Sequence, residues 1–185
     1  MSVVPIHIRP HLVPFFFKES DGKEHAYANR RVKTVIYSSD ISGIGRIIRR
    51  LMEKADRHLN VDHFNLCLTI TDSNNKKSYK GEIYKFANGA NSYLRLPEEA
   101  NDDINDLLED LFRMSFISYM NGCVENNEEA VVLKAIDRFI AKYDLEEFGF
   151  CNDSLRQLYY REKKNAKILA RFQSKSSNNI LKFNQ

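Results

Sequence analysis

The chain has 185 residues, of which 43% are hydrophobic and 29% charged, as expected of a globular protein rather than a disordered one. It has no run of about eighteen apolar residues and no basic region at its N-terminus, so neither a membrane span nor a secretory signal is expected. The net charge is only +3, but residues 98–153 hold fifteen acidic and four basic residues, whereas residues 154–185 hold eight basic and one acidic. Charge sorted in this way governs association rather than fold.

The first forty residues are expected to be largely extended. Residues 3–8 alternate around Pro5, and the prolines in and after them suit an edge strand or an arm, because proline donates no backbone hydrogen bond. The apolar triplet 15–17 needs a partner surface. Residues 19–28 predict a polar loop, and the β-branched segment 31–37 predicts a strand.

A helix is predicted next, beginning at Ser39 or Asp40 and ending near Leu59. Strict alternation then predicts a strand over 64–70, followed by strands over 78–86 and 92–96 in a β-meander. The predicted helix carries an apolar stripe formed by Ile44, Ile47, Ile48, Leu51 and Ala55.

Pro97 opens the helical half of the chain. Helical periodicity covers residues 98–121 and 128–143, and a third helix begins at Asn152 or Asp153. The fold class is therefore predicted as α+β, a small mostly antiparallel sheet with one packing helix, followed by a three-helix C-terminal half. The expected organisation is one compact domain with three parts: a β-rich part with an N-terminal arm and one basic helix (1–97), a helical part (98–173) and a flexible polar tail (174–185).

Metal and cofactor sites are not expected. His7 and His11 are four residues apart, but Pro10 between them prevents the helix that would align them. The acidic residues after Pro97 lie in helical register and lack the turn glycines of an oxygen-ligand loop. The three cysteines (67, 123 and 151) form no C-x-x-C pair and predict reduced thiols.

Catalysis is not expected either. Ser42-Gly43-Ile44-Gly45 precedes a helix, yet it lacks the third glycine of a dinucleotide fingerprint and the lysine of a P-loop. No Gly-x-Ser-x-Gly elbow is present, and no Ser or Cys has an assignable His–acid partner. The chain is therefore predicted not to be an enzyme.

Two charged surfaces are the candidate sites. The basic one could bind phosphates, with tyrosines stacking on bases, or carboxylates of a protein, and the acidic segment favours protein because it would repel DNA. Solvated faces are the alternative reading. The basic candidates are Arg46, Arg49, Arg50, Arg57, Arg156, Arg161, Lys163, Lys164, Lys167 and Arg171. The acidic candidates are Glu98, Glu99, Asp102, Asp103, Asp106, Glu109 and Asp110.

The length, the Asn/Ile/Lys/Tyr-rich composition, the β-then-α layout and the segment FGFCNDSLRQLYYREKK (148–164) carry a resemblance. The chain resembles the small ring and head–tail connector proteins beneath the portal of tailed bacteriophages, in style those of crAss-like phages of Bacteroides. The resemblance implies a ring of many copies, portal or tail proteins as neighbours, and no catalysis.

The expected function is thus that of a structural subunit of a phage virion, made in the cytoplasm of the bacterial host. It would act by head-to-tail self-association, because a subunit with basic and acidic regions can dock one sign onto the other, and by docking to other virion proteins. The alternative is a DNA-binding architectural protein of a phage or mobile element, using the same arginines.

Overall fold

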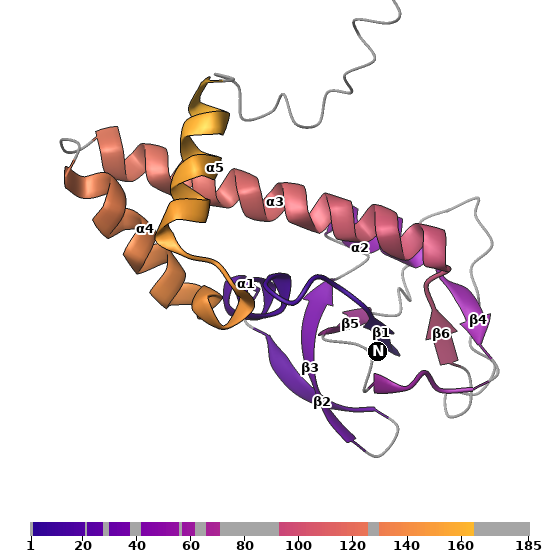
Figure 1. The fold of residues 1–185 in the computed structure, drawn as a ribbon. Coiled ribbons are helices and arrows are strands. Elements are labelled where there is room, and N and C mark those ends of the chain that lie inside the picture. The colour runs from indigo at the N-terminus through magenta and orange to yellow at the C-terminus, as the bar shows by residue number, and fades with distance from the viewer. Residues whose placement is uncertain are drawn as a thin grey trace, which may run out of the picture. The chain divides into compact units, whose positions relative to one another are not determined.

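The protein is described by a computed structural model, in which α-helices and two small sheets confirm the predicted α+β class (Figure 1). It divides into two compact units, Met1–Asp106 and Leu107–Gln185. The boundary falls inside a single long helix, α3 (Glu98–Glu125). The structure describes residues 2–20, 22–27, 30–37, 42–55, 57–61, 66–70, 93–125 and 130–164.

The larger sheet of the first unit has the strand order β1-β5-β3-β2. Its strands are β1 (Ser2–Ile6), β2 (Lys23–Tyr27), β3 (Arg30–Tyr37) and β5 (Leu66–Ile70). The β1–β5 and β2–β3 pairs are antiparallel and the β3–β5 pair is parallel, so the sheet is mostly antiparallel, as predicted. β1 lies at the edge of the sheet, where its proline needs no ladder partner for the missing N–H.

A second ladder joins β4 (Glu53–Ala55) to β6 (Tyr93–Arg95). The Nε atom of Arg95 donates a hydrogen bond to Oε1 of Glu53 across this pair, at 2.6 Å. The predicted meander is wrong for β5, since β5 lies between β1 and β3 instead of beside the next strand in sequence. The strand predicted over 78–86 lies outside the described residues.

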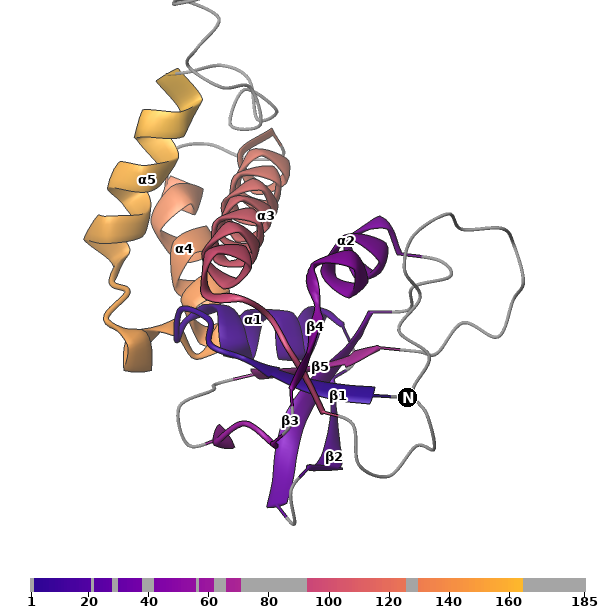
Figure 2. The ribbon, with the colours of Figure 1, turned by 90° about the vertical axis from the view of Figure 1, so that its right-hand side faces the viewer.

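The N-terminal arm is a wrong prediction, because the segment after β1 is part of the core. Helix α1 (Leu12–Glu19) packs against β3 (Figure 2). Its residues Leu12, Phe15 and Phe16 are buried. A proline is compatible with this helix because it occupies the first turn, where backbone N–H groups lack intrahelical partners. The predicted loop 19–28 instead contains the edge strand β2, and Gly22 before it leaves no room for a Cβ beside the ring of Phe17.

Helix α2 (Gly43–Leu51) is shorter than predicted at both ends. It begins after Ser42, whose side chain accepts a hydrogen bond from the N–H of Gly45 at 3.1 Å. It ends because Met52 is extended (φ −74°, ψ 142°) and buried, which directs the chain into β4. The glycine-containing start is therefore an ordinary N-cap.

The second unit contains the remainder of α3 together with α4 (Ala130–Tyr143) and α5 (Asn152–Lys164), which confirms the helical C-terminal half. α4 packs against α5 and against the short 3-10 helix Leu145–Phe148. Phe139 of α4 lies at the centre of this core, with ring centroids 5.0 Å from Phe116 and 4.8 Å from Tyr143. The predicted tail, 174–185, lies outside the described residues.

Candidate interaction surfaces

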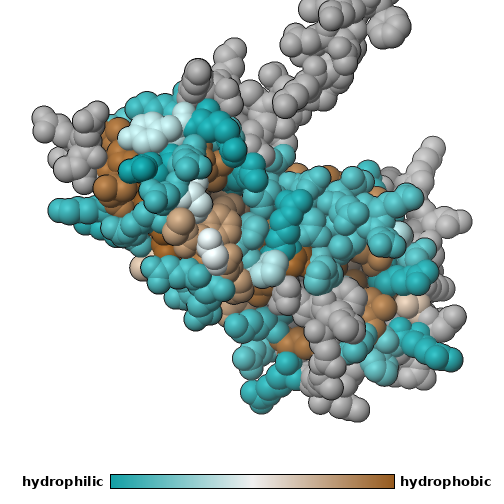
Figure 3. Space-filling model, viewed as in Figure 1, coloured by the Kyte–Doolittle hydropathy of each residue, from teal (hydrophilic) through white to brown (hydrophobic). Residues whose placement is uncertain are grey.

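The acidic residues at the start of α3 form one exposed surface. Glu98 and Glu99 lie in the first turn, where negative charge complements the helix dipole, but the remaining acids lie beyond this turn and gain little from it. At 3.6 residues per turn the set covers an arc of about 140° on one side of the helix. Hydrophilic side chains cover this part of α3 in Figure 3. The acidic stripe, as we call it, consists of the exposed residues Glu98, Glu99, Asp102, Asp103 and Asp106.

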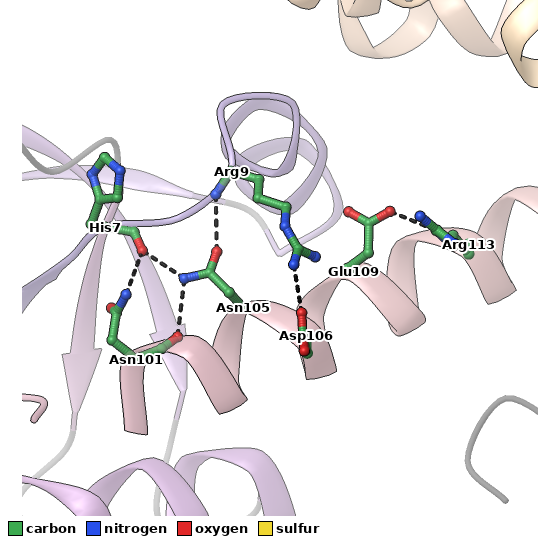
Figure 4. A network of polar contacts seen from close by, with 7 residues as sticks. All are labelled: His7, Arg9, Asn101, Asn105, Asp106, Glu109 and Arg113. Atoms are coloured by element: carbon green, nitrogen blue, oxygen red, sulfur yellow. Dashed lines mark hydrogen bonds and ion pairs between the residues drawn. The ribbon is translucent and has the colours of Figure 1, made fainter. Parts of the chain in front are cut away.

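A polar network fixes this part of α3 within the first unit (Figure 4). The buried amide of Asn105 accepts a hydrogen bond from the backbone N–H of Arg9 at 3.0 Å and donates one to the carbonyl of His7 at 2.7 Å. Asn101 donates a second hydrogen bond to the same carbonyl, at 3.0 Å. The amide of Asn105 thus forms the hydrogen bonds to the N–H of Arg9 and the carbonyl of His7 that a neighbouring strand would otherwise form. These bonds hold the acidic stripe in a fixed position.

Two acidic candidates do not belong to the exposed stripe. Glu109 is only 8% exposed and accepts a hydrogen bond from Nε of Arg113 at 2.6 Å, one turn later on α3. Asp110 is half-buried. Asp106 does belong to the stripe, and it forms an ion pair with Arg9. Among the described residues, no ion pair involves the other four acids of the stripe.

The outer face of α2 combines charge with apolar surface. Arg46 and Arg50 are exposed, one turn apart. Between and beside them Ile47 is 46% exposed and Leu51 is 36% exposed, whereas Ile48 on the other side of the helix is fully buried. We call Arg46, Ile47, Arg50 and Leu51 the α2 face.

The sequence did not indicate this division of the apolar stripe. Periodicity marked Ile47 and Leu51 as core positions together with Ile48, and only the orientation of the helix on its unit decides which side is covered. Arg49 is half-buried. The prediction that Arg57 shares the helix is wrong, because α2 ends at Leu51 and Arg57 lies in an exposed bend after β4.

The basic candidates of the second unit lie on α5. Arg156, Arg161 and Lys163 are exposed, and the structure separates the two neighbouring tyrosines: Tyr159 is 1% exposed and Tyr160 is 50% exposed. Helical spacing places Tyr159 on the apolar side of the helix with Leu155 and Leu158, in agreement with its burial, and leaves Tyr160 off that side. Lys164 is the last residue of α5. Lys167 and Arg171 lie outside the described residues.

The start of α5 also holds an exposed thiol that sequence reasoning left without a role. Cys151 precedes the helix, and its carbonyl accepts the hydrogen bond of Leu155 N–H at 3.2 Å. Hydrogen bonds from the backbone and the hydroxyl of Ser154 lower the pKa of the Cys151 thiol. An exposed thiolate at a helix N-terminus is more reactive than an ordinary cysteine.

Within the described ranges, no three His, Cys, Asp or Glu side chains are grouped so that they could hold a metal ion. None of the described helices is long and apolar enough to cross a membrane. Comparison of the chain with protein-family models, with curated proteins and with solved structures gave no significant match.

Proposed function

We propose that the protein is a non-catalytic assembly subunit that associates head to tail with copies of itself. In this proposal the acidic stripe of one copy docks onto the α2 face of the next. The observation that carries the proposal is the exposure of Ile47 and Leu51 directly beside Arg46 and Arg50, opposite in charge to the stripe.

The composition of the α2 face favours a protein partner. Burial of exposed aliphatic side chains by a partner is favourable, by about 25 cal/mol for each Å² of apolar area removed from water. Arginine beside them can pair with two carboxylate oxygens at once, and it is enriched in protein–protein interfaces. A nucleic acid could pair its phosphates with the arginines but would leave Ile47 and Leu51 in water.

The composition of the acidic stripe favours a basic partner. Glu98 and Asp102, like Glu99 and Asp103, are one turn apart on α3, so each pair of like charges is mutually destabilising in the isolated subunit. A cationic surface relieves this repulsion. Because the stripe and the α2 face are different surfaces of one chain, their pairing is heterologous, and such contacts close into rings when the rotation permits.

The biological setting follows from the resemblance. A ring of such subunits is the arrangement found in the connector proteins of tailed phages, with portal or tail components above and below. We therefore propose that the protein is a virion component of this class, located between portal and tail, and that its neighbours are other virion proteins.

The test is the mass of the particle in native mass spectrometry, with the buffer at low and at moderate salt. The double substitution Asp102→Lys with Asp103→Lys should abolish the oligomer, and so should Arg46→Glu with Arg50→Glu. An equimolar mixture of the two variants should form mixed oligomers, because one contact then joins two unaltered surfaces and in the other the introduced lysines meet the introduced glutamates.

The matched control is Glu146→Lys with Glu147→Lys, which makes the same change of charge at two exposed positions of the second unit. This control should assemble as the unaltered protein does. A monomer that no portal or tail component converts into an oligomer would contradict the proposal. So would an oligomer that keeps its mass in both interface variants. A chain that stays monomeric and shifts onto DNA instead would favour the architectural DNA-binding alternative.

A further inference from the structure

The exposed side of α5 differs from the α2 face in a way that points to another partner. Arg156 and Tyr160 are one turn apart, and Lys163 follows three residues later, so the three side chains lie on the same side of the helix. We call these residues the α5 face. We propose that the α5 face binds single-stranded nucleic acid, with Arg156 and Lys163 on phosphates and Tyr160 stacked on a base.

Tyr160 has the properties of a stacking platform. Its side chain is 50% exposed, and its ring lies 5.4 Å from that of Tyr159, centroid to centroid, at an interplanar angle of 56°. Tyr159 is buried, so the exposed ring rests on a fixed neighbour. A supported aromatic ring loses little conformational freedom when a base stacks on it, and base–aromatic stacking tolerates any sequence because every base has a π-face.

The charges around Tyr160 are available to phosphate. Arg156 forms an ion pair with Asp153 at 3.1 Å, but both side chains are exposed (48% and 74%), and pairs of this kind contribute little to stability. Phosphate can therefore replace the carboxylate. Lys163 lies 5.7 Å from the ring centre of Tyr159, which places its ammonium group beside the same aromatic pair.

An acidic protein surface is the less suitable occupant. In the described part of α5 the exposed side chains include no aliphatic residue, so a protein would bury little apolar surface there, in contrast to the α2 face. A polynucleotide requires none, because counterion release and stacking supply the affinity. The sequence reinforces this preference, since residues 154–185 hold eight basic residues and the single acid Glu162. The exposed described residues of α5 are Asp153, Ser154, Arg156, Gln157, Tyr160, Arg161 and Lys163.

The inference goes beyond the assembly function and does not depend on it. The α5 face lies in the second unit, whereas the acidic stripe and the α2 face lie in the first. A variant that cannot assemble, such as Asp102→Lys with Asp103→Lys, should still bind the oligonucleotide, which keeps the two proposals separately testable.

The experiment is fluorescence anisotropy of the full chain with a labelled oligothymidylate of about 16 nucleotides, long enough for one binding site of this kind. Tyr160→Ala should weaken binding about tenfold, the loss expected for one stacked base, and Tyr160→Phe should retain the affinity. Arg156→Gln with Lys163→Gln should weaken binding and reduce the slope of log K against log salt by about 1.4, since each phosphate contact on a single strand contributes about 0.7. Far-UV circular dichroism checks that each variant is folded.

The matched control is Lys134→Gln with Arg138→Gln, which removes the same charge from two exposed positions of α4 and should leave oligonucleotide affinity within about twofold of the unaltered protein. Heparin is the control for general attraction to polyanions, because it carries negative charge but no bases. Equal binding of the oligonucleotide by Tyr160→Ala and the unaltered protein would overturn the proposal and leave only general attraction to polyanions. Absence of oligonucleotide binding at low salt would overturn it as well, as would a loss in the control equal to that in the α5 variant.

Discussion

Asn105→Asp tests whether the amide of Asn105 holds α3 to the segment after β1. The substitution keeps the size of the side chain and the oxygen that accepts from the N–H of Arg9, but it removes the amide donor. That donor contacts the carbonyls of His7 at 2.7 Å and Asn101 at 3.0 Å. Two hydrogen bonds of about 1 kcal/mol each are lost, and a buried carboxylate then faces two carbonyl oxygens, so we expect a loss of about 3 kcal/mol in the free energy of unfolding at pH 7.

The loss should depend on pH in a defined direction. Burial and the two carbonyl oxygens disfavour the charged form, so the introduced carboxyl binds its proton more tightly in the folded protein than in the unfolded chain, where its pKa is about 3.9. The destabilisation is therefore complete at neutral pH and diminishes as the pH falls toward about 4, because the protonated acid can again donate to a carbonyl.

The assay is urea unfolding of the unaltered protein and the variant, followed by far-UV circular dichroism at pH 7 and at pH 4. The control is Asp103→Asn, the reverse chemical change at an exposed position of the same helix, which should alter stability by no more than about 0.5 kcal/mol. Identical unfolding midpoints at pH 7, or a difference that does not shrink at pH 4, would refute the role assigned to Asn105.

Three further predictions concern the second unit. Iodoacetamide should alkylate Cys151 at a lower pH in the folded protein than in urea, because hydrogen bonds from Ser154 lower its pKa, and Ser154→Ala should shift the alkylation profile, measured on the Cys151 peptide, to higher pH. Gly149→Ala should cost about 1 kcal/mol because φ is +79° there, whereas Gly122→Ala, in the last turn of α3 with open space around it, should stabilise by about 0.5 kcal/mol; a thermal midpoint equal to that of the unaltered protein would contradict either prediction. Phe139→Ala should cost about 3 to 5 kcal/mol in urea unfolding, since its ring contacts several aromatic neighbours, and a loss below about 1 kcal/mol would show that these contacts are not central to the core.

Local patterns predicted the elements in which apolar residues recur at a regular spacing. The helices of the C-terminal half and strands β3, β5 and β6 follow from periodicity, because each buries one side in a regular way. Helix α1 is not predicted because the prolines in and before it favour extended chain, although the first turn of a helix accepts proline. Strand β2 was missed because it begins with three polar residues, Lys23–His25, and an edge strand can carry charged side chains in place of an apolar alternation.

The remainder depends on contacts between distant residues. Leu51 and Ala55 keep helical spacing, yet α2 ends at Leu51 because the following residues pair with β6, about forty positions later. For the same reason the sequence could place Arg46 on a basic surface but could not show that Ile47 beside it is exposed. The link between His7 and Asn105 has no local signal at all, since neither residue carries a pattern that identifies the other.

The position of β5 in the sheet has a consequence for how the protein is made. β1 leaves the ribosome before its partner β5, which is complete only 64 residues after Ile6, and synthesis of that stretch takes roughly 3 to 13 seconds at ordinary elongation rates. The β2–β3 hairpin, by contrast, can pair within about 10 microseconds of its emergence. Val4 and Ile6 therefore stay without their native partner strand throughout that interval, whereas the later strands β2 and β3 can already be paired.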